Sequence, residues 1–148
     1  MFKNIQSFLL LMIPLVMMSV ATPARSADET FATYKYVLQA SDMDPSKQEL
    51  VLNNASNLLE AYPPGAVQVE IVAYGPGLRL LFADNANAKH IDSLSQSGVR
   101  FSACGNTLHA MTKMLGYEPK LNPDAVVVPG GVVRIGDLER KGYAYIKP

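Results

Sequence analysis

The chain has 148 residues, of which 49% are hydrophobic and 18% are charged, and this is the balance of one ordinary globular domain. Its 13 basic and 13 acidic residues give no formal net charge, so the charge balance does not suggest nucleic-acid binding. At this length a second folded domain is not expected.

The first residues have the pattern of a secretory signal peptide. Lys3 is followed by an apolar run over residues 8–20 and then by small residues, with a favourable cleavage point after Ser26. The run is too short for a membrane span of about 20 residues. We therefore expect residues 1–26 to be removed and the mature domain, residues 27–148, to be soluble in the periplasm without a membrane anchor.

Strand and helix signals alternate along the rest of the chain. Short β-branched and aromatic runs predict strands, and apolar residues at helical spacing predict helices. The expected strands cover residues 34–40, 67–73, 99–103, 125–128 and 143–146. The expected helices cover residues 45–61, residues 87–96, the stripe of Leu108, Met111 and Leu115 that Gly116 ends, and the segment that Pro129-Gly130-Gly131 opens. This alternation predicts an α/β fold with a mainly parallel five-stranded sheet and helices on both faces.

One short apolar segment fits neither pattern. Residues 78–82 follow a glycine-rich loop and read as either buried core or an interface between subunits.

Cys104 is the single cysteine of the chain, so no intrachain disulfide can form. It falls at a turn from a strand to a helix, at the edge where parallel sheets gather their ligands. The free N–H groups and the dipole of a helix N-terminus favour the thiolate form. We therefore expect an accessible thiol of low pKa. The alternative is a small buried apolar residue, because unpaired cysteines are among the most buried residue types.

The two histidines give weaker signals. His109 lies five residues beyond Cys104 and is not stacked over the thiol on an ideal helix, so we expect a hydrogen-bonded or solvent-facing histidine rather than a catalytic base. His90 lies among charged neighbours and is expected at the surface. One cysteine and two scattered histidines do not make a zinc site, and we expect no metal and no other cofactor.

Two glycine-rich turns have an arginine nearby. Gly75-Pro76-Gly77 precedes Arg79, and Gly130-Gly131 precedes Arg134, so either turn could direct backbone donors at an anion. Neither matches a nucleotide-binding fingerprint, and tight turns explain these glycines better.

Three segments resemble the DsrE/DsrF-like family of sulfur-relay proteins, in its exported branch. They are VEIVAYGPG at residues 69–77, GVRFSACGNTL at residues 98–108, and the C-terminal region from VPGGV at residue 128 to GYAYIKP at residue 148. The resemblance implies a YchN-like three-layer α/β fold and association into homotrimers or hexamers. It also implies a catalytic cysteine that accepts sulfane sulfur as a persulfide, and Cys104 is the residue that matches it.

The expected function is that of a periplasmic sulfur carrier or sulfurtransferase-like protein with Cys104 as the nucleophile. The sulfur donor and the acceptor are not identified by the sequence. Two other functions stay open: a non-catalytic binding or assembly module of the same fold, and a thiol redox sensor that uses the same cysteine.

Overall fold

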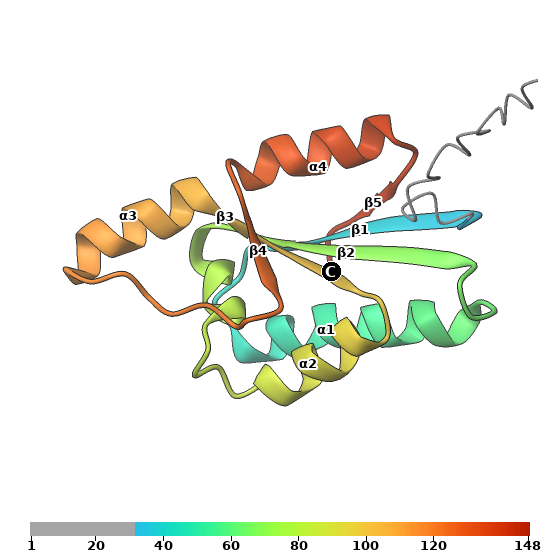
Figure 1. The fold of residues 1–148 in the computed structure, drawn as a ribbon, viewed down its shortest axis with the longest axis horizontal. Coiled ribbons are helices and arrows are strands. Elements are labelled where there is room, and N and C mark those ends of the chain that lie inside the picture. Colours follow the sequence, from blue (N-terminus) through green and yellow to red (C-terminus); the bar gives the residue numbers. More distant parts are fainter. Residues whose placement is uncertain (1–31) are drawn as a thin grey trace, which may run out of the picture.

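The computed structural model describes residues 32–148, and the signal peptide predicted at residues 1–26 lies outside this range. Within the described residues, five strands form one parallel sheet in the order β4-β3-β2-β1-β5 (Figure 1). The strands are β1 (Tyr34–Ala40), β2 (Val67–Ala73), β3 (Arg100–Cys104), β4 (Ala125–Val128) and β5 (Ala144–Ile146). The helices are α1 (Pro45–Ala61), α2 (Ala88–Gln96), α3 (Gly105–Leu115), α4 (Gly131–Arg140) and the 3-10 helix η1 (Gly75–Leu81). The predicted α/β fold is confirmed.

The direction in which the chain moves along the sheet decides which face each helix covers. From β1 to β4 each new strand is added on the same side of the previous one. Because parallel crossovers are right-handed, the helices between these strands fall on one face. The chain then returns from β4 at one edge to β5 at the other, which places α4 on the opposite face. Figure 1 shows α1 and α2 on one side of the sheet and α4 on the other.

The two faces differ in how much apolar surface they bury. A large cluster joins the sheet to α1, α2, α3 and η1, and it includes fully buried Leu52 and Ile71 and nearly fully buried Phe101. The cluster under α4 is small and consists of Val37, Val72, Ile135 and Leu138. The part of this second face that lies over β3 and β4 is therefore not closed by apolar packing.

The apolar segment at residues 78–82 belongs to the core. Leu78, Leu80 and Leu81 are fully buried in η1, and Phe82 packs against the same cluster. The possibility that this segment is an interface between subunits is therefore wrong, because its side chains are already used within the chain.

Local signals explain the helix ends on which the site depends. The Asp44 side chain caps α1 by accepting a hydrogen bond from the Ser46 amide at 2.8 Å. Gly116 ends α3 with a φ of 79°, in the left-handed region that favours glycine. At the site, the boundary differs from the prediction: β3 begins at Arg100 and continues through Cys104, which pairs with Val128 of β4. Two further elements begin one residue later than predicted, α2 at Ala88 and β5 at Ala144. Among the described residues, no helix is long and apolar enough to cross a membrane.

Candidate functional site

Cys104 lies where the chain leaves two neighbouring strands, β3 and β4, toward opposite faces of the sheet. It is the last residue of β3 and the N-cap of α3. The adjacent strand β4 leads into α4, which covers the other face. In open α/β sheets the carboxyl ends of two such strands form the crevice in which ligands bind. The structure therefore places the thiol at the position where this fold accommodates chemistry.

The carboxyl ends of β1 and β5 do not offer a comparable site. The hollow there is lined by residues that include Gln39, Ser41, Lys47 and Lys147, and its volume is about 10 Å³. Such a volume holds about one water molecule. A ligand larger than water has no room at that end of the sheet.

Hydrogen-bond donors from two helices surround the Cys104 sulfur. Hydrogen bonding from the Thr107 hydroxyl and from the backbone of Gly131, Thr107 and Asn106 acts to lower the pKa of the Cys104 thiol. Thr107 and Asn106 lie in the first turn of α3, and Gly131 begins α4. Thr107 Oγ1 accepts from the Gly75 amide at 3.0 Å, which leaves the hydroxyl proton available to another acceptor.

These donors decide the ionisation of the thiol. Burial raises the pKa of Cys104, but the hydrogen bonds from the Thr107 hydroxyl and the Gly131, Thr107 and Asn106 amides outweigh it and hold the pKa below its ordinary value. A structural cysteine in an apolar core has no such set of donors. The direction of the shift agrees with the low pKa that the sequence predicts.

The accessibility of the thiol differs from the prediction. Cys104 is buried, with 5% of its surface exposed, so the expectation of an accessible thiol is wrong for the single chain. The physical reason is that α4 closes over the end of β3. A β-carbon added at Gly131 would lie 2.9 Å from Cβ and 3.0 Å from Cδ1 of Tyr74, so the first turn of α4 packs directly on the tyrosine.

Tyr74 and Gly131 thus border the sulfur on the side of α4. Burial raises the pKa of Tyr74, and the charges of Tyr145 and Cys104 add to this effect. The phenol therefore stays protonated at neutral pH. It therefore adds no negative charge to the surroundings of the thiolate.

A buried carboxylate lies on the same face of the sheet. Glu70 in β2 is 1% exposed, and its two oxygens accept from Nε and Nη2 of Arg134 in α4, each at 2.7 Å. Its Oε1 also accepts from the Ser102 hydroxyl at 2.6 Å. Arg134 is therefore paired within the protein, which removes the basis for an anion site at this arginine.

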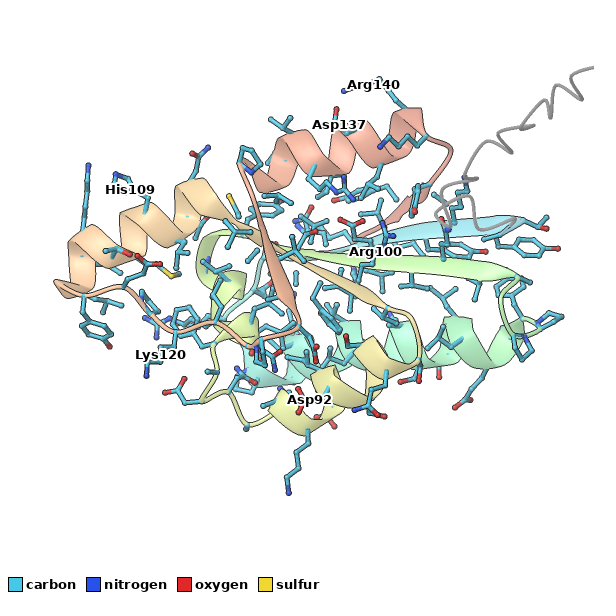
Figure 2. The ribbon with its side chains drawn as sticks, in the orientation of Figure 1. Asp92, Arg100, His109, Lys120, Asp137 and Arg140 are labelled. Atoms are coloured by element: carbon cyan, nitrogen blue, oxygen red, sulfur yellow. The ribbon has the colours of Figure 1, made fainter. Side chains whose placement is uncertain are left out.

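The histidines take no part in the site. His109 is exposed on α3 and lies on the outer side of this helix (Figure 2), as predicted. His90 is half-buried between α1 and α2, where its Nε2 lies 3.3 Å from the Ser56 hydroxyl, so it is less exposed than the sequence predicts. Within residues 32–148, no group of three or more His, Cys, Asp or Glu side chains is placed to hold a metal ion.

The sequence did not identify Thr107, Tyr74 or Glu70 as parts of the site, and it offered Gly131 only as part of a turn that could direct backbone donors at an anion. Glu70 carries a readable signal, because an ionisable residue in the middle of a buried β-branched strand requires a partner. Thr107 lies three residues after Cys104, at the position where a side chain in the first helical turn can reach back to the N-cap. Gly131 carries no such signal, since its contact with Cys104 exists only through the pairing of β3 with β4.

The fold and the site define a class of protein: a doubly wound α/β domain that holds a thiolate-favouring cysteine where two strands part. No family model matches the sequence, and no curated protein matches it. Among solved structures, the chain is similar to MTH1491, a protein of unknown function from Methanobacterium thermoautotrophicum, with 34% sequence identity and a TM-score of 0.71. The match covers 78% of this chain and 99% of that chain. The chain therefore belongs to the same family as MTH1491.

Proposed function

We propose that the protein is an exported sulfur carrier of the DsrE/DsrF-like type, on which Cys104 accepts sulfane sulfur as a persulfide and passes it to another thiol. The observation that carries the proposal is the set of donors from α3 and α4 that hold the Cys104 sulfur. The resemblance of the segments around residues 69–77, 98–108 and 128–148 to this family supports it.

The donors fit both halves of a sulfur transfer. In the first half, the Cys104 thiolate attacks the outer sulfur of a persulfide or polysulfide donor. A new S–S bond forms, the S–S bond of the donor breaks, and the remainder of the donor leaves with the electron pair as a thiolate. In the second half, an acceptor thiolate attacks the outer sulfur, and Cys104 leaves as a thiolate. A thiol of low pKa is the better leaving group, so the same hydrogen bonds serve this step.

The burial of the thiol limits the kinds of sulfur donor that can reach it. Because 5% of Cys104 is exposed, a small linear donor such as inorganic polysulfide reaches the sulfur more readily than a cysteine on the surface of another folded protein. Tyr74 and the first turn of α4 form the border that such a donor passes. Bulky alkylating reagents should accordingly react with Cys104 much more slowly than iodoacetamide does. This difference in rate should disappear when the protein is unfolded.

Self-association is part of the proposal. Val126 and Val127 of the edge strand β4 and Val132 and Val133 of the first turn of α4 are 65%, 52%, 67% and 66% exposed in the single chain. These four valines lie on the strand and the helix that flank Cys104, and burial of exposed apolar side chains favours association. We expect a homotrimer or hexamer, which sedimentation at micromolar concentrations would show. A monomeric mass would contradict this part.

Intact mass spectrometry tests the central step. The purified mature protein should gain the mass of one or more sulfur atoms after polysulfide treatment, and dithiothreitol should remove it. Cys104→Ser should take up none while keeping its circular dichroism spectrum. A protein that never gains sulfur but forms a reversible sulfenic acid or mixed disulfide would be a redox sensor, and one that does neither would be a binding module.

We also propose that the protein acts in the periplasm, on the basis of the signal peptide predicted at residues 1–26. Amino-terminal sequencing of protein from the periplasmic fraction should begin near Ala27. Retention of Met1 in a cytosolic fraction would refute it.

A further inference from the structure

The buried carboxylate of Glu70 has no part in the sulfur transfer described above. An ionised side chain at a buried position is costly unless it is paired and hydrogen-bonded. Glu70 meets that requirement with three hydrogen bonds, two from Arg134 at 2.7 Å and one from Ser102 at 2.6 Å. A pair of this kind is no better for stability than well-packed apolar residues. Stability alone therefore does not explain why Glu70 and Arg134 are paired here.

The partners of Glu70 connect it to the surroundings of the thiol. Arg134 lies in the first turns of α4, where its amide donates to the carbonyl of the N-cap Gly130 at 2.9 Å, and it follows Gly131 by three residues. Ser102 lies two residues before Cys104 in β3, so both side chains face α4. The network thus ties the first turns of α4 to β2 and β3 beside the sulfur.

Apolar packing alone does not fix this end of α4. The buried residues that α4 contributes to the small cluster, Ile135 and Leu138, lie further along the helix and pack with Val37 and Val72 of β1 and β2. On the side of β3 and β4, the face under Arg134 opens into a hollow of about 490 Å³. At its first turn, α4 packs on Tyr74 on the side of β2, and the opposite side faces the hollow. Apolar packing therefore leaves the first turn free to shift toward the hollow.

We propose that Glu70 and Arg134 are positioning residues that hold the first turn of α4 beside the end of β3, so that the Gly131 amide donates to the Cys104 sulfur. The Asn106 amide donates to the Pro129 carbonyl at 3.3 Å, which places the chain entering α4 beside the N-terminus of α3. This inference rests on the proposed use of Cys104 as a thiolate. Two parallel N–H to oxygen contacts fix direction as well as distance, which a single contact or an apolar patch does not. The pair has no net charge, so it acts on the thiol through the placement of α4.

The test replaces both partners, because removal of one leaves a buried charge. In Glu70→Leu/Arg134→Met, we expect the midpoint of the pH profile for alkylation of Cys104 by iodoacetamide to rise by about one unit. The midpoint is the readout because it reports ionisation, whereas the rate at one pH also depends on how far α4 covers the thiol. The matched control is Asp137→Asn/Arg140→Gln, which removes the ion pair on the outer side of the same helix (Figure 2). The control should keep the wild-type midpoint.

A folded double variant with the wild-type midpoint would overturn the inference. If that variant does not fold, Arg134→Lys takes its place, since it keeps the charge and loses the two-point contact. It should raise the midpoint partially, and an unchanged midpoint would again be decisive against the inference.

A second readout follows the contact itself. In wild type, the NMR signal of the Gly131 amide should shift as Cys104 ionises, and in the double variant this response should be lost. Sulfur uptake by the wild type tests the proposed function separately. If the wild type takes up no sulfur but the variants show these shifts, the proposed function is refuted and the positioning role is kept. If the wild type takes up sulfur but the variants show no shift, the function is kept and the positioning role is refuted.

Discussion

Replacing Gly131 with alanine places a methyl group where the protein has no room for one. The added β-carbon would lie 2.9 Å from Cβ and 3.0 Å from Cδ1 of Tyr74, closer than such atoms approach in proteins. The nearest of these atoms is close to the backbone and cannot rotate away. The first turn of α4 must therefore move, and the Gly131 amide moves with it away from the Cys104 sulfur.

The size of the effect follows from the contact that is lost. A hydrogen bond to a charged group contributes about 1.5–3 kcal/mol, and sulfur as a weak acceptor belongs at the low end. Since one pKa unit corresponds to about 1.4 kcal/mol, the pKa of Cys104 should rise by about one unit. The strain should cost about 1–3 kcal/mol of stability, which a domain of ordinary stability survives.

The assay is the pH profile of iodoacetamide alkylation, which reports the thiolate fraction, together with urea unfolding. Gly136→Ala is the matched control, because its β-carbon would meet only Arg140 Nη1 at 3.7 Å. It should leave the alkylation midpoint unchanged and add up to about 1 kcal/mol of stability, as alanine does inside a helix. If Gly131→Ala is folded and has the wild-type midpoint, the contribution of α4 to the thiolate is refuted.

Other changes probe the same network from different sides. Thr107→Val should raise the pKa of Cys104 because it removes the hydroxyl donor, whereas Thr107→Ser should restore the wild-type alkylation profile. The pKa of the Cys104 thiol is lower in the folded state than its unfolded value of about 9.0. The stability that this shift contributes is fully present above the unfolded pKa, and it is lost as pH falls through the folded pKa. The difference in unfolding free energy between wild type and Cys104→Ser should therefore grow as pH rises toward 9.0, and a difference that is flat with pH would contradict it. Arg134→Met alone should cost about 3–5 kcal/mol in urea unfolding, and most of this should return when Glu70→Leu is added.

Local chemistry made much of the fold predictable. The helix over residues 45–61 has an N-cap acceptor, a proline at its first position and a Pro-Pro-Gly stop, and α1 has these same ends. The strand over residues 67–73 is a β-branched run between turn signals, and β2 matches it. The placement of Cys104 between a strand and a helix needed only the order of these elements.

The rest of the site depends on contacts between distant parts of the chain. Gly131 reaches Cys104 because β4 pairs with β3 and because the return to β5 sends α4 to the second face. Neither fact leaves a local trace in the residues around Gly131. The burial of the thiol was missed for the same reason, since it follows from the packing of α4 on Tyr74.

The return crossover also has a consequence for folding. Among the described elements, α4 and β5 come last in the sequence, and β5 must pair with β1 at the far edge of the sheet. Until it does, β1 is itself an edge strand. A chain cut before α4 should therefore keep the surroundings that α3 gives to Cys104 and lose those that α4 gives. The surroundings of Cys104 are thus completed only when a contact has formed at the opposite edge of the sheet.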